Sequence, residues 1–372
     1  MRVDGSGIER LTLTDLQQEN PGLRRLAHGY ATSGTWQRLV RRGANVLREV
    51  ATALPRDLAR RLTHTGSNLL RVEPGDDPQP GASRIALYVH YAPDGRISDM
   101  VRCQLRLLRD YGFAVVLITM APGVPEDDWQ ALRPLCALLV HRRNFGLDFG
   151  AWRDLVPQVR QRWPQLQELM LANDSVMGPI YPLEPVIAAL RAGGEGLFGL
   201  TESLQGGAHL QSYMLLARGP AAISDLLTFL QHLFVTHSKW LLVQMSEIRL
   251  ARWMRRRGHR VAALYGYERL LHAALADPEQ RRRLAASHAK LRGLEQMPDD
   301  EAEALLHAWP LNPTQHFWHL LATRFHSPFV KTELIRRNPG QLPGVDEWPA
   351  IVPPDAPCAL PLLQAHLAAM GR

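Results

Sequence analysis

Short apolar runs alternate with amphipathic stretches from residue 84 onward, and this alternation constrains the fold more than any other feature of the chain. The runs at 84–92, 114–121, 137–143 and 167–172 have the length and apolar content of buried strands. Between them, 98–112, 126–133 and 150–163 carry apolar residues at helical spacing. Strands that alternate with helices form a mostly parallel sheet covered on both faces. We therefore predict an α/β fold.

The pattern continues with strands predicted at 197–203, 210–217 and 259–265 and helices at 220–236 and 240–257. From residue 268 onward the chain is predicted to be mostly helical. This divides the chain into a sheet domain at 84–267 and a helical C-terminal region at 268–372.

Residues 1–73 are strongly basic and are predicted to be helical, and the Pro- and Gly-rich segment 74–83 is predicted to be a linker. Apolar residues recur at roughly helical spacing within the basic segment, at Trp36, Leu39, Val40, Val46, Leu47 and Val50. The segment is interpreted either as a solvated helix packed on the main domain or as a basic amphipathic surface that rests on anionic lipid. The net charge of +7 agrees with an anionic partner but does not identify one.

Three polar, glycine-containing loops follow predicted strands: "HYAPDG", "RNFGLDFG" and "NDSVMGP". Each is explained alone by turn chemistry. In a parallel sheet, however, all three would meet at the carboxyl edge, where ligands bind. Their convergence favours a functional role for Asp174 over a simple strand end.

Two further carboxylates have both a structural and a functional interpretation. Asp148, with Asn144, offers polar groups to a ligand, but it is also placed to cap the helix that follows. Glu247 lies near the start of a basic helix, where it complements the helix dipole or serves as a general base.

Several function classes are excluded or weakened by missing motifs. GxGxxG after the first strand, GxxxxGK[ST] and GxSxG are all absent, which removes the phosphate cradles of dinucleotide and P-loop folds and weakens a serine hydrolase. Three widely spaced cysteines fit a reducing cytosol, and no apolar run has the length of a membrane span. No nucleic-acid-binding module is recognisable, so nucleic acid is not an expected partner.

The strings "LYVHYAPDGRISD", "RRNFGLDFGAW", "LMLANDSVMGPI", "FGLTES", "HLQSYMLLA" and "NPTQHFWHLLATRFHSPFVKTELIRRNP", in this order, resemble the rhamnan synthesis protein F family of glycosyltransferases. They cover roughly residues 84 to 340. The resemblance implies a GT-A-like fold and transfer of a sugar, often rhamnose, from a nucleotide sugar to a growing surface polysaccharide such as a lipopolysaccharide O-antigen. The N-terminal basic segment lies outside it.

Within this resemblance the polar residues acquire expected roles. Asp174, in "NDS", occupies the place of the metal-binding acidic motif of GT-A enzymes, but it supplies one carboxylate rather than two. A divalent metal, Mg²⁺ or Mn²⁺, is therefore an expectation, with part of the phosphate charge taken by arginine. The residues expected to contact the nucleotide or its phosphates are Tyr91, Asp94, Arg142, Arg143, Asn144, Asp148, Asn173 and Ser175.

An inverting transfer also needs a base for the acceptor hydroxyl. Glu247, in "EIRLARWMRRRGHR", resembles the carboxylate that precedes the corresponding helix in many inverting GT-A enzymes. Glu202 and His209 are the second and third candidates.

The expected function is thus transfer of rhamnose from dTDP-rhamnose to a lipid-linked glycan, in the cytoplasm or at the inner face of the plasma membrane. A UDP- or GDP-sugar donor is one alternative. A non-catalytic scaffold of a polysaccharide-assembly complex is the other, and it predicts no release of nucleotide.

Overall fold

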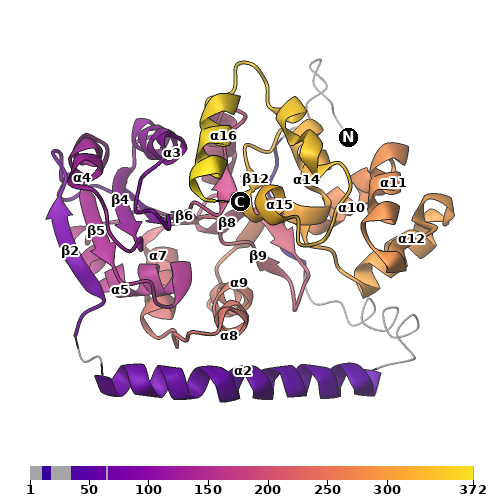
Figure 1. Ribbon diagram of the computed structural model, residues 1–372, viewed down its shortest axis with the longest axis horizontal. Coiled ribbons are helices and arrows are strands. Elements are labelled where there is room, and N and C mark those ends of the chain that lie inside the picture. The colour runs from indigo at the N-terminus through magenta and orange to yellow at the C-terminus, as the bar shows by residue number, and fades with distance from the viewer. Residues whose placement is uncertain (1–10, 18–34, 64–65, 372) are drawn as a thin grey trace.

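The computed structural model describes residues 11–17, 35–63 and 66–371, and its centre is a ten-stranded sheet (Figure 1). The strand order is β1-β11-β8-β10-β6-β3-β4-β5-β2, with β9 paired to β8. Six strands run parallel to one another: β3 (Arg84–His90), β4 (Ala114–Thr119), β5 (Leu138–Arg142), β6 (Glu168–Asn173), β8 (Gly196–Ser203) and β11 (Val261–Tyr265). The predicted α/β fold with a largely parallel sheet is confirmed.

One central strand runs against the rest. The strand β10 (Met214–Arg218) lies between β6 and β8 and pairs antiparallel with both. It begins four residues later than predicted, because the chain first forms the short strand β9 (His209–Leu210) on β8. The intervening residues 211–213 therefore cross the carboxyl ends of β6 and β8 rather than lying within the sheet.

Helices cover both faces of the sheet and divide its core in two. On one face, apolar side chains of the sheet pack with α3 (Asp99–Asp110), α4 (Glu126–Leu132), α6 (Glu184–Ala192) and most of the C-terminal region. On the other face they pack with α5 (Leu147–Arg162), α7 (Pro220–Gln231), α8 (Lys239–Met245) and α9 (Glu247–Arg256). Burial on both faces explains why the strands are apolar almost throughout.

The C-terminal region is mostly helical, as predicted. Its helices are α10 (Tyr267–Leu275), α11 (Pro278–Ser287), α12 (Asp299–Ala308), α13 (Pro313–His316), α14 (Trp318–Thr323), α15 (Thr332–Arg337) and α16 (Leu360–Ala369). It also contains one short strand, β12 (Val330–Lys331), which pairs with β7 (Val176–Met177) directly after the loop that contains Asp174. This pairing returns the C-terminal region to the carboxyl edge of the sheet.

The N-terminal segment is less uniformly helical than predicted. It contains the long helix α2 (Thr35–Thr63), but β1 (Thr14–Asp15) and β2 (Leu69–Pro74) add an edge strand at each end of the sheet. In β2, the partly buried Leu69, Arg71 and Val72 pair with β5, so residues 69–73 belong to the sheet rather than to a helix. Residues 1–10 and 18–34 of the predicted helical segment lie outside the described residues.

Within the described ranges, no helix combines the length and the apolar character needed to cross a membrane.

Candidate functional site

The end of β6, Asn173-Asp174-Ser175, is held by hydrogen bonds at the carboxyl edge of the sheet. The backbone N–H of Tyr91, which follows β3, donates to Asp174 Oδ2 at 2.8 Å, and the Asp174 N–H donates to the Val89 carbonyl at 3.1 Å. Asn173 Oδ1 accepts from both the N–H and the hydroxyl of Ser175, at 3.1 and 2.5 Å. The carboxylate of Asp174 is therefore fixed between the ends of two parallel strands.

Asp148 joins this group from the first turn of α5. The turn before it has Gly146 at a φ of 76°, and a Cβ at that position would lie 1.9 Å from Cγ1 of Val235, so a side chain does not fit there. Asp148 Oδ2 accepts a hydrogen bond from Asn173 Nδ2 at 2.8 Å. The carboxylate thus faces the end of β6.

Glu247 reaches the same edge because the long predicted helix at 240–257 is broken. Ser246 leaves helical geometry with φ −106° and ψ −79°, and its hydroxyl donates to the Leu242 carbonyl at 2.6 Å. A new helix, α9, therefore begins at Glu247. Its Oε1 accepts from the backbone N–H of Ser212 at 2.6 Å, in the crossing segment that precedes β10.

Lys331 is the fourth charged member of the cluster, and the sequence did not identify it. The strand β12 places its Nζ 3.1 Å from the hydroxyl of Ser175. The available signal was its position in "HSPFVKTELIRRNP", within a segment that resembles the family; however, 84 residues separate it from Glu247 and 157 from Asp174. We call these four residues, the carboxylates Asp148, Asp174 and Glu247 together with Lys331, the carboxylate cluster. They come from four separate segments of the chain.

Burial and repulsion by neighbouring carboxylates raise the pKa values of the two aspartates. Burial, with a contribution from the charge of Asp148, raises the pKa of Asp174 to about 7 even though the Tyr91 N–H and Lys331 oppose the change. Burial likewise raises the pKa of Asp148 to about 6, and Glu247 adds to this. Burial lowers the pKa of Lys331 against the opposing effect of Glu247 and Asp148. Such perturbed groups in one place are typical of functional sites.

A cavity of about 270 Å³ lies beside this edge, between the loop after β3 and helix α16. Its lining includes His90, Asp94, Ser98 and His366. His366 is buried and its Nδ1 lies 2.8 Å from the Ser98 hydroxyl, whereas its Nε2 has no hydrogen-bond partner among the described residues. Burial lowers the pKa of His366 to about 4, so the ring is neutral at pH 7. The wall of the cavity therefore carries a neutral imidazole whose Nε2 is buried.

The other residues expected at the nucleotide are spread around this edge. Asp94 lines the cavity and its Oδ1 accepts from the Arg96 N–H at 3.0 Å. Tyr91 and Asn144 are exposed, and the backbone N–H of Arg143 donates to the Asn68 carbonyl at 2.9 Å.

Arg142, by contrast, lies in a buried structural site. Its guanidinium is fully buried, donates to Asp154 at 2.6 Å and to the Phe145 carbonyl at 2.9 Å, and lies 3.0 Å from the sulfur of Met120. The structure therefore directs Arg142 into the loop that carries Asp148 rather than toward an open phosphate site. The sequence could not show this, because an arginine that follows an apolar strand fits both settings.

We expect Arg142→Met to destabilise the protein by about 2–4 kcal/mol. The reason is that the Asp154 carboxylate, whose side chain is only 17% exposed, loses its ion-pair partner. Urea unfolding measures this directly. The exposed Arg96→Met is the control and should change the free energy of unfolding by less than about 0.5 kcal/mol. An unchanged unfolding free energy for Arg142→Met would contradict the structural role.

The alternative bases have different surroundings. Glu202 is buried, and its two carboxylate oxygens accept from the backbone N–H groups of Gln17 and Tyr267, at 2.8 and 3.0 Å. It thereby ties β1 and the start of α10 to β8. His209 is buried in β9, with Nδ1 2.8 Å from the Gly207 carbonyl. Of the three candidates, only Glu247 belongs to the carboxylate cluster.

The donor atoms of the cluster are of the kind that hold Mg²⁺ or Mn²⁺. Asp174 and Asp148 offer carboxylate oxygens, which these ions prefer. In the described part of the chain, the one triad of metal-ligand side chains with donor atoms within 4.8 Å of one another is Glu268, His272 and Glu303, on α10 and α12. Asp148, Asp174 and Glu247 do not form such a triad in the described structure.

Comparison with known proteins agrees with the resemblance in the sequence. The family model for rhamnan synthesis protein F matches residues 115–265, which include the loops of Asp148 and Asp174 and the start of α9. An uncharacterized protein, y4gN, from Sinorhizobium fredii is 27% identical over 201 residues, 52% of this chain and 52% of that protein. Virulence protein VirA from Vibrio anguillarum is 24% identical over 266 residues, 70% of this chain and 82% of that protein. The chain thus spans about half the length of the first relative, and the family match connects it with rhamnan synthesis.

Proposed function

We propose that this chain is a glycosyltransferase that takes its sugar from a nucleotide donor. The observation that carries the proposal is the convergence of Asp148, Asp174, Glu247 and Lys331 from four distant segments at the carboxyl edge of a parallel sheet. Packing of the sheet and helices does not require these four charged side chains to lie together. Three of them, Asp148, Asp174 and Lys331, have perturbed pKa values. The family match supports sugar polymer synthesis as the setting.

The strand order supports a GT-A-like arrangement for this site. Three parallel strands, β5, β4 and β3, continue into β6, and the antiparallel β10 separates β6 from β8. The acidic loop follows β6, the fourth strand of the parallel series. The donor would lie across the carboxyl ends of β3 and β6, with its nucleoside in the cavity lined by Asp94 and His366.

Departure of a nucleoside diphosphate leaves negative charge on phosphate oxygens, and cationic groups must stabilise that charge. The ammonium group of Lys331, 3.1 Å from the Ser175 hydroxyl, would take this role. A divalent metal, held by Asp174 with Asp148 nearby, would supply further positive charge at the phosphates. Glu247, fixed by the Ser212 N–H, is the base that accepts the proton of the acceptor hydroxyl, which implies inversion at the sugar carbon.

For the donor we propose dTDP-rhamnose, and for the acceptor a lipid-linked glycan, with the family match as support. The direct test is thermal stabilisation by a panel of dTDP, UDP, GDP and their sugars, each with and without Mn²⁺. Stabilisation by dTDP compounds is the expected result. Stabilisation by another nucleotide would change the donor, and no shift at millimolar concentrations would favour the non-catalytic scaffold.

His366→Phe should weaken nucleotide binding at least tenfold, because the phenyl ring cannot pair with the Ser98 hydroxyl and its larger size changes the shape of the cavity wall. The exposed His288→Phe, on the far α11 side, serves as the matched control. Titration of the melting temperature with nucleotide measures both. Equal affinity of the His366 variant and wild type would place the nucleoside elsewhere.

A further inference from the structure

The long helix α2 presents its polar side to the rest of the protein. Glu49 Oε2 accepts from the Ser238 hydroxyl at 2.7 Å, and Asp57 Oδ1 accepts from the backbone N–H of His237 at 3.0 Å, with the His237 ring nitrogen Nδ1 2.5 Å away. Ala53 is buried between these two contacts. Helices that pack on a domain normally turn an apolar stripe inward, so the orientation of α2 is reversed.

The leucines of α2 point outward instead. Leu47, Leu54, Leu58 and Leu62 are 71%, 55%, 56% and 74% exposed. Spacings of seven, four and four residues place them on one stripe of the helix. Together they are half of the eight large hydrophobic side chains exposed in the described structure. A continuous apolar stripe of this kind indicates a surface that is covered in use.

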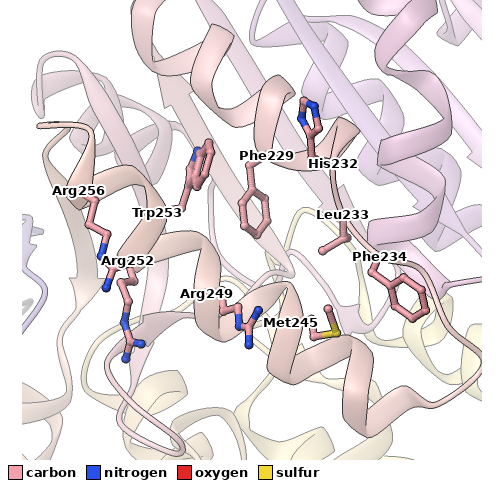
Figure 2. Close-up of a pocket in the computed structure, with 9 residues that line it drawn as sticks. All are labelled: Phe229, His232, Leu233, Phe234, Met245, Arg249, Arg252, Trp253 and Arg256. Carbon is pink, nitrogen blue, oxygen red and sulfur yellow. The ribbon is translucent and has the colours of Figure 1, made fainter. Parts of the chain in front are cut away.

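Next to α2, helices α7, α8 and α9 enclose a groove of about 520 Å³ (Figure 2). Arg249, Arg252 and Arg256 line it, three and four residues apart on one face of α9, and all are exposed. The remaining lining residues are mostly apolar or aromatic: Phe229, His232, Leu233, Phe234, Met245 and Trp253. No carboxylate is among the nine lining residues, so the groove suits a ligand with anionic and apolar parts.

The groove and the leucine stripe belong to the same end of the molecule. Phe234 of the groove lies three residues before His237, which holds α2. Figure 1 shows α2 running below α8 and α9. At 100° per residue, the three arginines lie on the side of α9 opposite Glu247. The groove therefore faces away from the carboxylate cluster and is not part of the donor site.

We propose that this end of the protein docks on an anionic lipid bilayer. The leucine stripe inserts at the boundary between headgroups and acyl chains, and the arginines of the groove bind lipid phosphates. Charge favours lipid over a second copy of the chain, because Arg48 and Arg56 are also exposed on α2 and two such basic faces would repel each other. The inference rests on neither the donor nor the reaction proposed above.

The test is sedimentation of the full chain with vesicles of phosphatidylcholine alone or with about 30 mol% phosphatidylglycerol, which gives the vesicles a negative surface potential. Wild type should bind only the anionic vesicles. Combined reversal of Arg249, Arg252 and Arg256 to Glu should lower the partition constant at least a hundredfold, since each arginine near an anionic surface contributes about fivefold. The exposed Arg282→Glu on α11 is the matched control and should bind like wild type.

Leu54→Asp with Leu58→Asp tests the apolar part separately and should also abolish binding, whereas high salt should weaken the wild type only partly. Circular dichroism and thermal unfolding verify that each variant is folded. Wild type that fails to bind anionic vesicles would overturn the proposal. So would a wild-type dimer, seen by light scattering, that the leucine changes convert to monomer without any vesicle binding.

Discussion

Asp174→Asn is expected to lower the rate of sugar transfer about a thousandfold. The amide retains an oxygen that can accept from the Tyr91 N–H, so the strand ends remain tied together. What is lost is the negative charge that would hold the metal against the departing diphosphate, a contribution of several kcal/mol to the transition state. Release of nucleoside diphosphate, followed with a coupled assay in Mn²⁺, measures the effect.

The same substitution should raise stability at pH 8, which distinguishes a functional carboxylate from a structural one. In the native state the pKa of Asp174 is about 7, whereas an unfolded Asp has a pKa of about 3.9. Between these values the native protein binds more protons than the unfolded chain, so its stability falls as pH rises from about 4 to 7. Asn cannot ionise, and the variant should therefore lose this pH dependence.

The expected gain in melting temperature at pH 8 is about 1–3 °C, with little difference from wild type at pH 4. The exposed Asp110→Asn is the matched control, and we expect no change in transfer. If the Asp174→Asn variant retained sugar transfer, Asp174 would not be part of the catalytic site. A large loss of stability at pH 8 would instead show that the carboxylate holds the fold.

The fold was largely predictable because its signals are local. Apolar runs bounded by glycine and polar loops predicted β3, β4, β5 and β6, since a strand buried on both faces is apolar over most of its length. The antiparallel direction of β10 was not predictable, because a buried strand has the same composition in either direction. β2 was also missed, since a half-buried edge strand has a weak pattern.

The site was predictable only in part, because its residues are brought together by contacts between segments that are distant in the sequence. Asp148, Asp174 and Glu247 lie next to strand ends or helix starts, where polar residues are visible against the pattern. Lys331 and His366 come from the C-terminal region. They reach the site only because that region packs back against β7 and the start of α3, which a local sequence pattern does not show. Arg142 shows the converse error, because a local pattern does not reveal that Asp154 is its partner.

Glu247→Gln is the second change with a large expected effect, and it separates the candidate bases. The glutamine Oε1 can still accept from the Ser212 N–H, so the start of α9 stays in place. It cannot accept the proton of the acceptor hydroxyl, and loss of general base catalysis lowers kcat by 10²- to 10⁴-fold, with about 10³ expected here. Nucleotide binding should be unchanged.

Glu202→Gln is the matched variant, because both glutamates are partly or fully buried and both accept from backbone N–H groups. Both oxygens of Glu202 are occupied, by Gln17 and Tyr267, so a glutamine must turn its NH₂ group toward one of these donors. That leaves a buried donor without an acceptor and should cost about 1–3 kcal/mol of unfolding free energy. The kcat of the folded protein should remain within about twofold. A carboxylate that only ties β1 and α10 to β8 accepts no proton during the reaction. A thousandfold loss of kcat in Glu202→Gln, with full activity in Glu247→Gln, would therefore identify Glu202 as the base and give Glu247 the structural role.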